Sequence, residues 1–313
     1  MPNLAVIGHP VGHSRSPAIQ TVALAEMGLA GEWTYGALDV APEDFEAEVA
    51  ELAAAGEYVG VNVTVPHKEA ALAMADEVSE GARAIGAANT LSFKDGQIMA
   101  ANTDAGGLLR SLPASLAAEG GAGGDEPGEA RIGEGDGARD GARRALVLGA
   151  GGAARAAIWA LAHGGEGSPA EAPGHAEPGD EQPRPPHIPP FEVHVWNRTA
   201  ERAETVAAEL GARAVADPDP DNYALIVNTT AVGLAGEDTF EALPLTPDSF
   251  SPGQVVLDMV YGEEPSPLLA AAEAAGAITV DGLEMLVQQG ALSLAIWTGE
   301  EPDIEAMRTA VRH

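Results

Sequence analysis

The stretch Ala145-Leu146-Val147-Leu148-Gly149-Ala150-Gly151-Gly152-Ala153-Ala154 decides the fold that this chain adopts. An apolar run, a glycine-rich turn and the small residues that follow are typical of a buried strand that leads directly into a helix. Strand signals and helix signals alternate in the same way on both sides of this stretch. The alternation predicts an α/β fold with largely parallel sheets.

The same stretch contains the spacing G-x-G-x-x-A at Gly149, Gly151 and Ala154. Between a strand and a helix this pattern is a dinucleotide-binding fingerprint, because glycines let the backbone approach a pyrophosphate at the helix N-terminus. A plain packing turn is the alternative in a chain so rich in alanine and glycine. We predict a Rossmann-type unit whose cofactor contacts come from Gly149, Ala150, Gly151, Gly152 and Ala153.

The end of the next predicted strand indicates which nucleotide binds. NAD sites place an acid there, whereas this strand ends in Asn197-Arg198-Thr199, and Arg202 follows one helical turn later. Two guanidiniums on one helix face and a hydroxyl suit a 2′-phosphate. A surface pair that balances neighbouring glutamates is the alternative. We predict NADP, with contacts from Asn197, Arg198, Thr199 and Arg202.

Local signals place elements in the first half of the chain. Ser16-Pro17 predicts a helix start with Ser16 as N-cap, and apolar residues at helical spacing predict a helix from Phe45 to Gly56. The run from Val59 to Val65 predicts a buried strand, with Pro66 opening the next helix. Residues 119–142, rich in glycine and acids, and the proline-rich residues 164–190 are typical of loosely ordered surface insertions.

The charge balance excludes several functions. The chain has 48 acidic and 16 basic residues and a net charge of −32, so its field repels nucleic acid and anionic membranes. Such a composition favours a protein from a high-salt environment over an ordinary acidic cytosolic protein. Without cysteine there are no disulfides, and the histidines lack metal-ligand spacing, so we expect no metal.

The sequence shows no signal for export or for insertion into a membrane. The N-terminus lacks a signal peptide, and no apolar run is long enough to span a membrane. We therefore expect a cytoplasmic protein. The sequence leaves open whether the chain forms a homodimer.

Lysine is nearly absent, so the position of Lys68 is informative. The chain has two lysines, Lys68 and Lys94, and Lys68 ends the run Asn62-x-Thr64-x-Pro66-x-Lys68. An ammonium can release a proton in suitable surroundings, whereas a guanidinium cannot. A leftover surface lysine is the alternative. Polar motifs that also follow predicted strands, where α/β sheets bind ligands, are Gly12-His13-Ser14-Arg15-Ser16, Gly86-Ala87-Ala88-Asn89-Thr90 and Asn102-Thr103-Asp104.

These motifs resemble, in order and over nearly the whole chain, those of the shikimate dehydrogenase family. The Gly-Ala-Gly-Gly-Ala and Asn-Arg-Thr motifs, Asp258-Met259-Val260-Tyr261 and the segment from Asp281 to Gln289 continue the series. The chain departs from the family in its two acidic insertions, its low lysine content, and Glu284 and Gln288. None of these departures replaces a motif residue with an expected role.

The resemblance implies NADP-linked interconversion of shikimate and 3-dehydroshikimate, a step of aromatic amino acid biosynthesis. It assigns Lys68 as general acid and base, paired with Asp104. Implied substrate contacts come from Ser14, Ser16, Thr64, Asn89, Asp104, Tyr261 and Gln289. Met259 and Gly282 would flank the nicotinamide, and Glu80 would lie near the cofactor.

The implied architecture has two domains. Residues 1–104 and 283–313, the latter helical, would form the substrate-binding domain, and residues 105–282 the NADP-binding domain with both insertions. A quinate/shikimate dehydrogenase is the nearest alternative, because one pocket residue can decide between these substrates. A non-catalytic NADP-binding sensor is a remote alternative, since a sensor needs neither Lys68 nor Asp104.

Overall fold

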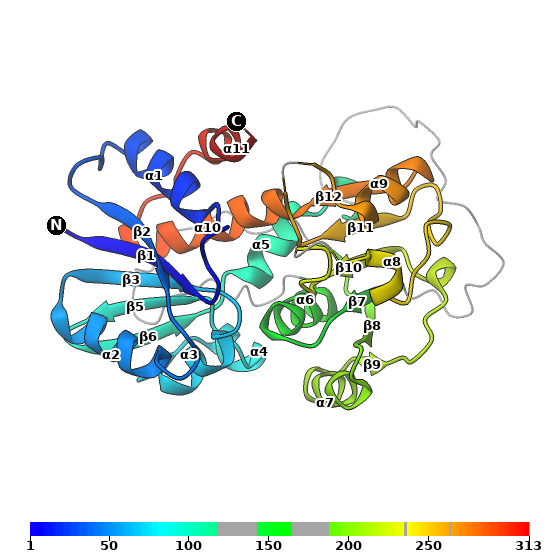
Figure 1. Ribbon diagram of the computed structural model, residues 1–313, viewed down its shortest axis with the longest axis horizontal. Helices are drawn as coiled ribbons and strands as arrows, with labels where there is room; N and C mark the ends of the chain where they lie inside the picture. Colours follow the sequence, from blue (N-terminus) through cyan, green and yellow to red (C-terminus); the bar gives the residue numbers. More distant parts are fainter. Residues whose placement is uncertain (118–142, 165–187, 235–236, 263, 313) are drawn as a thin grey trace. The chain divides into compact units, whose positions relative to one another are not determined.

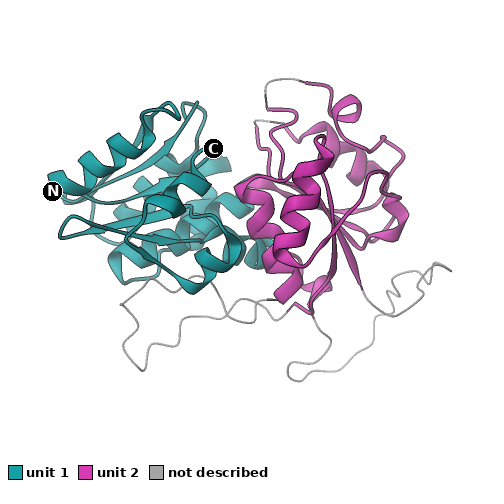
Figure 2. Cartoon of the chain, turned by 90° about the horizontal axis from the view of Figure 1, so that it is seen from below, with its two compact units in different colours: residues 1–111, 167–185, 283–313 teal, residues 112–166, 186–282 magenta. Residues whose placement is uncertain are grey.

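The computed structural model describes residues 1–117, 143–164, 188–234, 237–262 and 264–312. These residues form two compact units (Figure 2). The first comprises residues 1–111 and 283–312, and the second comprises the described residues between 112 and 282. The predictions for the two insertions concern residues that lie almost entirely outside the described part of the chain.

A six-stranded mixed sheet forms the centre of the first unit (Figure 1). Its strands are β1 (Asn3–Gly8), β2 (Thr34–Asp39), β3 (Tyr58–Val63), β4 (Glu77–Val78), β5 (Thr90–Lys94) and β6 (Gln97–Ala101). Their order is β2-β1-β3-β5-β6-β4, and β5 runs antiparallel to both of its neighbours while the other pairs are parallel. A turn between β5 and β6 is short enough for a hairpin, which explains the antiparallel pair.

Helices cover both faces of this sheet. They are α1 (Ser16–Glu26), α2 (Phe45–Ala55), α3 (Lys68–Met74), α4 (Glu80–Ile85), α5 (Asp104–Ser111), α10 (Gly282–Thr298) and α11 (Ile304–Arg312). Alternate residues of β1 face opposite cores: Leu4 and Val6 pack with α1, α10 and α11, whereas Ala5 and Ile7 pack with α2 and α3. The helical tail predicted from the sequence is therefore part of the first unit.

The second unit contains a six-stranded parallel sheet. Its strands are β7 (Arg144–Leu148), β8 (Glu192–Trp196), β9 (Arg213–Ala214), β10 (Leu225–Asn228), β11 (Val255–Asp258) and β12 (Ile278–Asp281). Their spatial order is β12-β11-β10-β7-β8-β9. The chain adds β8 and β9 on one side of β7 and then adds β10, β11 and β12 on the other, so the strand order reverses between β7 and β10. This is Rossmann topology, and such sheets bind ligands at the carboxyl ends of the strands beside that reversal. The predicted fold class is confirmed.

Helices also cover the second sheet. They are α6 (Gly152–His163), α7 (Ala200–Leu210), α8 (Thr239–Ala242) and α9 (Pro267–Ala274), with 3-10 turns at Ala114–Leu116 and Pro220–Asn222. The four residues of β10 and of β11 are all buried, as expected for parallel strands with helices on both faces.

Three local predictions are corrected by the structure. Ser16 is the first residue of α1 rather than its N-cap, and Arg15 occupies the N-cap position without a side-chain cap. The strand predicted from Val59 to Val65 ends at Val63, and Val65 is 61% exposed. The next helix begins at Lys68 and not at Pro66. The helix predicted from Phe45 is confirmed and ends at Gly56, whose φ of 70° lies in the left-handed region.

Candidate active site

A buried ion pair between Lys68 and Asp104 is the centre of the site in the first unit. Lys68 is the first residue of α3, and Asp104 is the first residue of α5. The Lys68 ammonium donates to Asp104 Oδ2 at 2.6 Å, and the two side chains are only 12% and 5% exposed. Two shielded opposite charges stabilise each other, and removal of either leaves the other uncompensated. The structure thus brings together the two predicted catalytic residues.

Neighbouring amides hold Asp104 in position. Asn102 Oδ1 accepts the Asp104 backbone N–H at 3.0 Å, so Asn102 caps α5 and the Asp104 carboxylate is left for other partners. Asn89 Nδ2 donates to Asp104 Oδ1 at 2.8 Å. Each carboxylate oxygen of Asp104 therefore has its own donor, one from Lys68 and one from Asn89.

Gln289 joins this cluster from the distant end of the chain. Asn89 Nδ2 lies 3.2 Å from Gln289 Oε1, although the two residues are 200 positions apart. A Cβ added at Gly107 would lie 2.7 Å from Gln289 Cβ, so the absence of a side chain on α5 lets α10 approach. The predicted substrate residues Asn89 and Gln289 thus lie beside the Lys68–Asp104 pair.

Three hydroxyl residues follow β1 and β3 at the same end of the first sheet. Ser14 Oγ accepts the Ser16 backbone N–H at 3.2 Å, and the Ser16 side chain hydrogen-bonds to the buried Tyr35 phenol. Thr64 follows β3, and its backbone N–H donates to the Ile7 carbonyl at 2.9 Å. These hydroxyls are neutral hydrogen-bond donors, which suit an oxygen-rich anion such as a carboxylate.

In the second unit the glycine turn after β7 has the geometry of a pyrophosphate site. Gly149 has a φ of +122°, and a Cβ there would lie 2.4 Å from Thr229 Oγ1. Gly151 precedes α6, and a Cβ there would meet no heavy atom within 4 Å. Gly151 has no side chain to cap the helix, so backbone N–H groups at the start of α6 remain available to an anion. The turn therefore fits a dinucleotide.

The end of β8 carries the residues predicted to select NADP. Asn197 Nδ2 donates to the Thr199 carbonyl at 2.9 Å, and Arg198, Thr199 and Arg202 are exposed. Arg198 lines a surface pocket of about 540 Å³ with Trp196, residues 237–238 and residues 241–244. The carboxylates that line the same pocket belong to Glu237, Asp238 and Glu241. The guanidinium expected to meet a 2′-phosphate thus has acidic neighbours.

Asp258 shapes the loop that carries Met259 and Tyr261. It is 1% exposed, and its Oδ1 accepts from Asn228 Nδ2 at 2.8 Å and from the Val260 N–H at 3.0 Å. Burial raises the pKa of the Asp258 carboxyl above its usual value, although these hydrogen bonds and one from a serine oppose the shift. The sequence motifs include Asp258 without an expected role and do not include Asn228.

The remaining predicted residues divide between the two units. A Cβ at Gly282, the first residue of α10, would lie 2.4 Å from the Met259 carbonyl oxygen, so these two residues are adjacent. Tyr261 lies in the second unit, whereas the other predicted substrate residues lie in the first. Glu80 is exposed at the start of α4 in the first unit, whereas the other predicted cofactor residues lie in the second. The roles of Tyr261 and Glu80 stay predictions.

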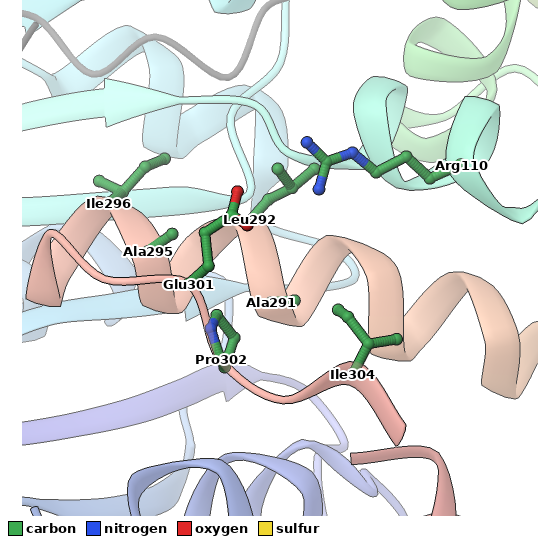
Figure 3. A pocket seen from close by; sticks show the side chains of 8 residues that line it. All are labelled: Arg110, Ala291, Leu292, Ala295, Ile296, Glu301, Pro302 and Ile304. Carbon is green, nitrogen blue, oxygen red and sulfur yellow. The ribbon is translucent and has the colours of Figure 1, made fainter. Parts of the chain in front are cut away.

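A smaller pocket in the first unit lies between α5, α10 and the segment before α11 (Figure 3). It encloses about 50 Å³ and is lined mainly by apolar side chains, with Arg110 and Glu301 as its charged members. Burial lowers the pKa of the Arg110 guanidinium, and the charge of Glu301 opposes that effect. Its lining includes none of the predicted site residues.

Two global properties accompany the site. Within the described ranges, no helix is long and apolar enough to cross a membrane. The same residues contain no group of three or more histidine, aspartate or glutamate side chains arranged to hold a metal ion.

Comparisons with known proteins point to one family. A model of the shikimate dehydrogenase substrate binding domain matches residues 6–91, and a model of the shikimate 5′-dehydrogenase C-terminal domain matches residues 282–312. The NADP(+) shikimate dehydrogenase of Brucella abortus (strain S19) is 39% identical over 310 residues, which cover 97% of this chain and 91% of that protein. Its counterpart in Geobacter metallireducens is 37% identical and covers 98% and 95%.

Solved structures agree with these matches. Shikimate 5-dehydrogenase from Thermus thermophilus, in complex with NADP(H) and shikimate, superimposes with a TM-score of 0.76 at 37% identity. The match covers 100% of this chain and 99% of that chain. Shikimate dehydrogenase from Aquifex aeolicus gives a TM-score of 0.78 at 32% identity, and that match covers 100% of this chain and 98% of the other.

Proposed function

Because the chain belongs to the shikimate dehydrogenase family and interconverts 3-dehydroshikimate and shikimate with NADP(H), we propose that Lys68 and Asp104 perform the proton transfer of this reaction. The observation that carries the proposal is the 2.6 Å contact between the Lys68 ammonium and Asp104 Oδ2, shielded from solvent at the starts of α3 and α5. A shielded lysine with a fixed carboxylate partner is well placed to exchange a proton with a substrate hydroxyl.

The chemistry assigns each residue one task. In shikimate oxidation the neutral amine of Lys68 takes the proton of the C3 hydroxyl, and in the reverse direction its ammonium returns that proton to the oxygen. NADP(H), when bound, accepts or supplies the hydride at C3. Asp104 orients the Lys68 side chain through the hydrogen bond to its Oδ2. Positioned acid–base groups typically contribute about 10²–10⁴-fold to a rate.

Residues of the first unit would bind the substrate. Ser14 and Ser16 would hold the carboxylate, and the substrate hydroxyls would contact Thr64, Asn89, Asp104, Tyr261 and Gln289. The hydroxyls that follow β1 and β3 and the amides clustered around Asp104 support this assignment. Neutral hydrogen-bond donors and acceptors of this kind discriminate among polyhydroxy acids by leaving an unmatched group unpaired.

Residues of the second unit would bind the cofactor. The turn Gly149-Ala150-Gly151-Gly152-Ala153 would hold the pyrophosphate, and the 2′-phosphate would contact Asn197, Arg198, Thr199 and Arg202. Met259 and Gly282 would flank the nicotinamide, with Glu80 nearby. The open backbone at Gly151 and the exposed guanidinium of Arg198 support these assignments. A cytoplasmic location agrees with the sequence.

A spectrophotometric assay tests the proposed function. Purified protein in about molar KCl, a salt level that screens a highly charged chain, would be offered shikimate or quinate, each with NADP or NAD. We expect reduction of the nicotinamide with shikimate and NADP. Equal turnover of quinate would favour the quinate/shikimate alternative. Folded protein that binds NADPH but reduces neither cofactor would favour the sensor and contradict the proposal.

A further inference from the structure

Ser293 lies in the middle of a buried polar network beneath the Lys68–Asp104 pair. Its side chain is fully buried on α10, and its hydroxyl accepts from Asn62 Nδ2 at 2.8 Å. The same hydroxyl lies 2.9 Å from Thr90 Oγ1, 3.0 Å from Thr103 Oγ1 and 3.0 Å from the Gln289 carbonyl oxygen. One hydroxyl thus connects β3, β5, the segment after β6 and α10.

The threonines in this network fix the orientation of Asn89. Asn89 Oδ1 accepts the Thr103 backbone N–H at 2.7 Å and the hydroxyls of Thr90 and Thr103 at 3.1 and 3.2 Å. The amide nitrogen of Asn89 must therefore face the opposite way, towards Asp104 Oδ1. A rotated amide would place its oxygen against the carboxylate, where two acceptors cannot bond.

Tyr35 fixes the other side of the network. Its hydroxyl donates to Asn62 Oδ1 at 2.7 Å, which leaves Asn62 Nδ2 to face Ser293. Burial raises the pKa of the Tyr35 phenol well above its usual value, so this hydroxyl stays a donor across the working pH range. Every polar side chain between Tyr35 and Asp104 has at least one hydrogen-bond partner, and a satisfied buried network of this kind is rigid.

We propose that Ser293 is a positioning residue of the reaction, which holds Thr90 and Thr103 so that Asn89 keeps Asp104 in place against Lys68. The inference rests on the proposed function of that pair. Ser293 does not bond to Lys68 or Asp104 directly; it acts through Asn89 and the two threonines. Ser293 belongs to none of the sequence motifs, and it is not among the residues predicted to contact the substrate or the cofactor.

The variant Ser293→Ala removes the hydroxyl and leaves the helix intact. We expect kcat for shikimate oxidation to fall about tenfold, because displacements below 1 Å at reacting groups cost less than the roughly 10²-fold known for a full ångström. KM for NADP should stay within about twofold, since its predicted contacts lie elsewhere.

A matched control separates positioning from simple loss of a buried hydroxyl. Ser111 is also a buried helical serine of the first unit, and its hydroxyl donates to the Leu108 carbonyl at 2.7 Å. Ser111→Ala removes the same atoms outside the network and should leave kcat unchanged. If Ser293→Ala does not fold, the pair Thr90→Val and Thr90→Ser replaces it, and only the valine variant should lose rate.

The outcomes distinguish this inference from the proposed function. Loss of kcat with an unchanged KM for NADP in Ser293→Ala or Thr90→Val, together with wild-type kcat in Ser111→Ala and Thr90→Ser, supports the positioning role. Wild-type kcat in Ser293→Ala, while the unmodified enzyme oxidises shikimate with NADP, would overturn the inference and leave the function intact. An unmodified enzyme that does not oxidise shikimate would overturn both.

Discussion

At the scale of single residues, Arg198 is the side chain expected to separate NADP from NAD. It follows β8 where NAD sites carry an acid, and it is exposed beside a pocket that also contains three carboxylates. A hydrogen bond between charged groups is worth about 1.5–3 kcal/mol. We therefore predict that Arg198→Ala raises KM for NADP by about 10- to 100-fold and changes KM for NAD less than about twofold.

Steady-state kinetics with both cofactors check this prediction. The control Arg213→Ala removes the same charge from an exposed position of the second unit, at the start of β9. Because long-range effects of net charge are shared by both variants, only Arg198→Ala should change the preference between the cofactors. An equal rise of KM for NADP and NAD in Arg198→Ala would show that Arg198 does not contact a 2′-phosphate.

Residue identity predicted some of the site and missed the rest. Lys68 and Asp104 stood out because reactive side chains followed predicted strand ends, and the structure places them 2.6 Å apart. Ser293 and Tyr35 did not, because a serine within an apolar helix and a tyrosine within a strand match ordinary packing patterns. Their partners come from strands and helices distant in sequence, so only the folded chain shows the network.

At the scale of elements, Glu284 and Arg308 join α10 to α11. Arg308 Nε and Nη2 donate to the two Glu284 oxygens at 2.8 and 2.7 Å, and Gln288 Nε2 donates to Glu284 Oε1 at 2.8 Å. Burial alone would raise the pKa of Glu284, but the hydrogen bonds from Arg308 and Gln288 outweigh it, so this pKa lies below its usual value. The two residues that depart from the family motif thus bond to each other.

The ion pair between Glu284 and Arg308 predicts that the stability of the folded protein depends on pH. Since the folded pKa of Glu284 is lowered, its stabilisation is fully present above the unfolded pKa of about 4.3 and is lost as the pH falls through the folded pKa. Glu284→Gln should lower the free energy of unfolding by about 1 kcal/mol at neutral pH, a value discounted for partial exposure. This difference in the free energy of unfolding between wild type and variant should disappear at acid pH.

Urea unfolding of the wild type and the variant at neutral and acid pH, at constant salt, measures the difference. The control Glu51→Gln changes an exposed carboxylate on α2 and should have little effect at either pH. A deficit in Glu284→Gln that is equal at both pH values would contradict a contribution from ionised Glu284.

Elements were predictable where local pattern determines them. The helix that begins at Phe45 and the strand–turn–helix at Gly149 follow directly from spacing and glycine, and both are present. The antiparallel orientation of β5 was not predictable, because the relative direction of a strand depends on which strands it pairs with in the folded sheet. The prediction of Ser16 as an N-cap was wrong by one residue, because Ser16 is already the first residue of α1, and its hydroxyl bonds to Tyr35, which is remote in sequence.

At the scale of the whole molecule, the net charge of −32 predicts that salt stabilises the fold. Repulsion among unscreened carboxylates destabilises the compact state, and the Debye length falls from about 10 Å at 0.1 M salt to about 3 Å at 1 M. Tm from thermal denaturation should therefore rise as KCl is raised over this range. A Tm that is constant or falls would contradict both this account and the predicted high-salt origin.

The catalytic assignment of Lys68 is the central claim, and one pair of variants tests it most directly. Lys68→Ala should lower kcat by about 10²–10⁴-fold, because the proton acceptor is lost, while Kd for NADPH stays within about twofold. Lys94→Ala, which removes the other lysine of the chain from an exposed strand end, should keep wild-type kcat. A Lys68→Ala enzyme that turns over shikimate at a rate close to wild type would show that another group transfers the proton.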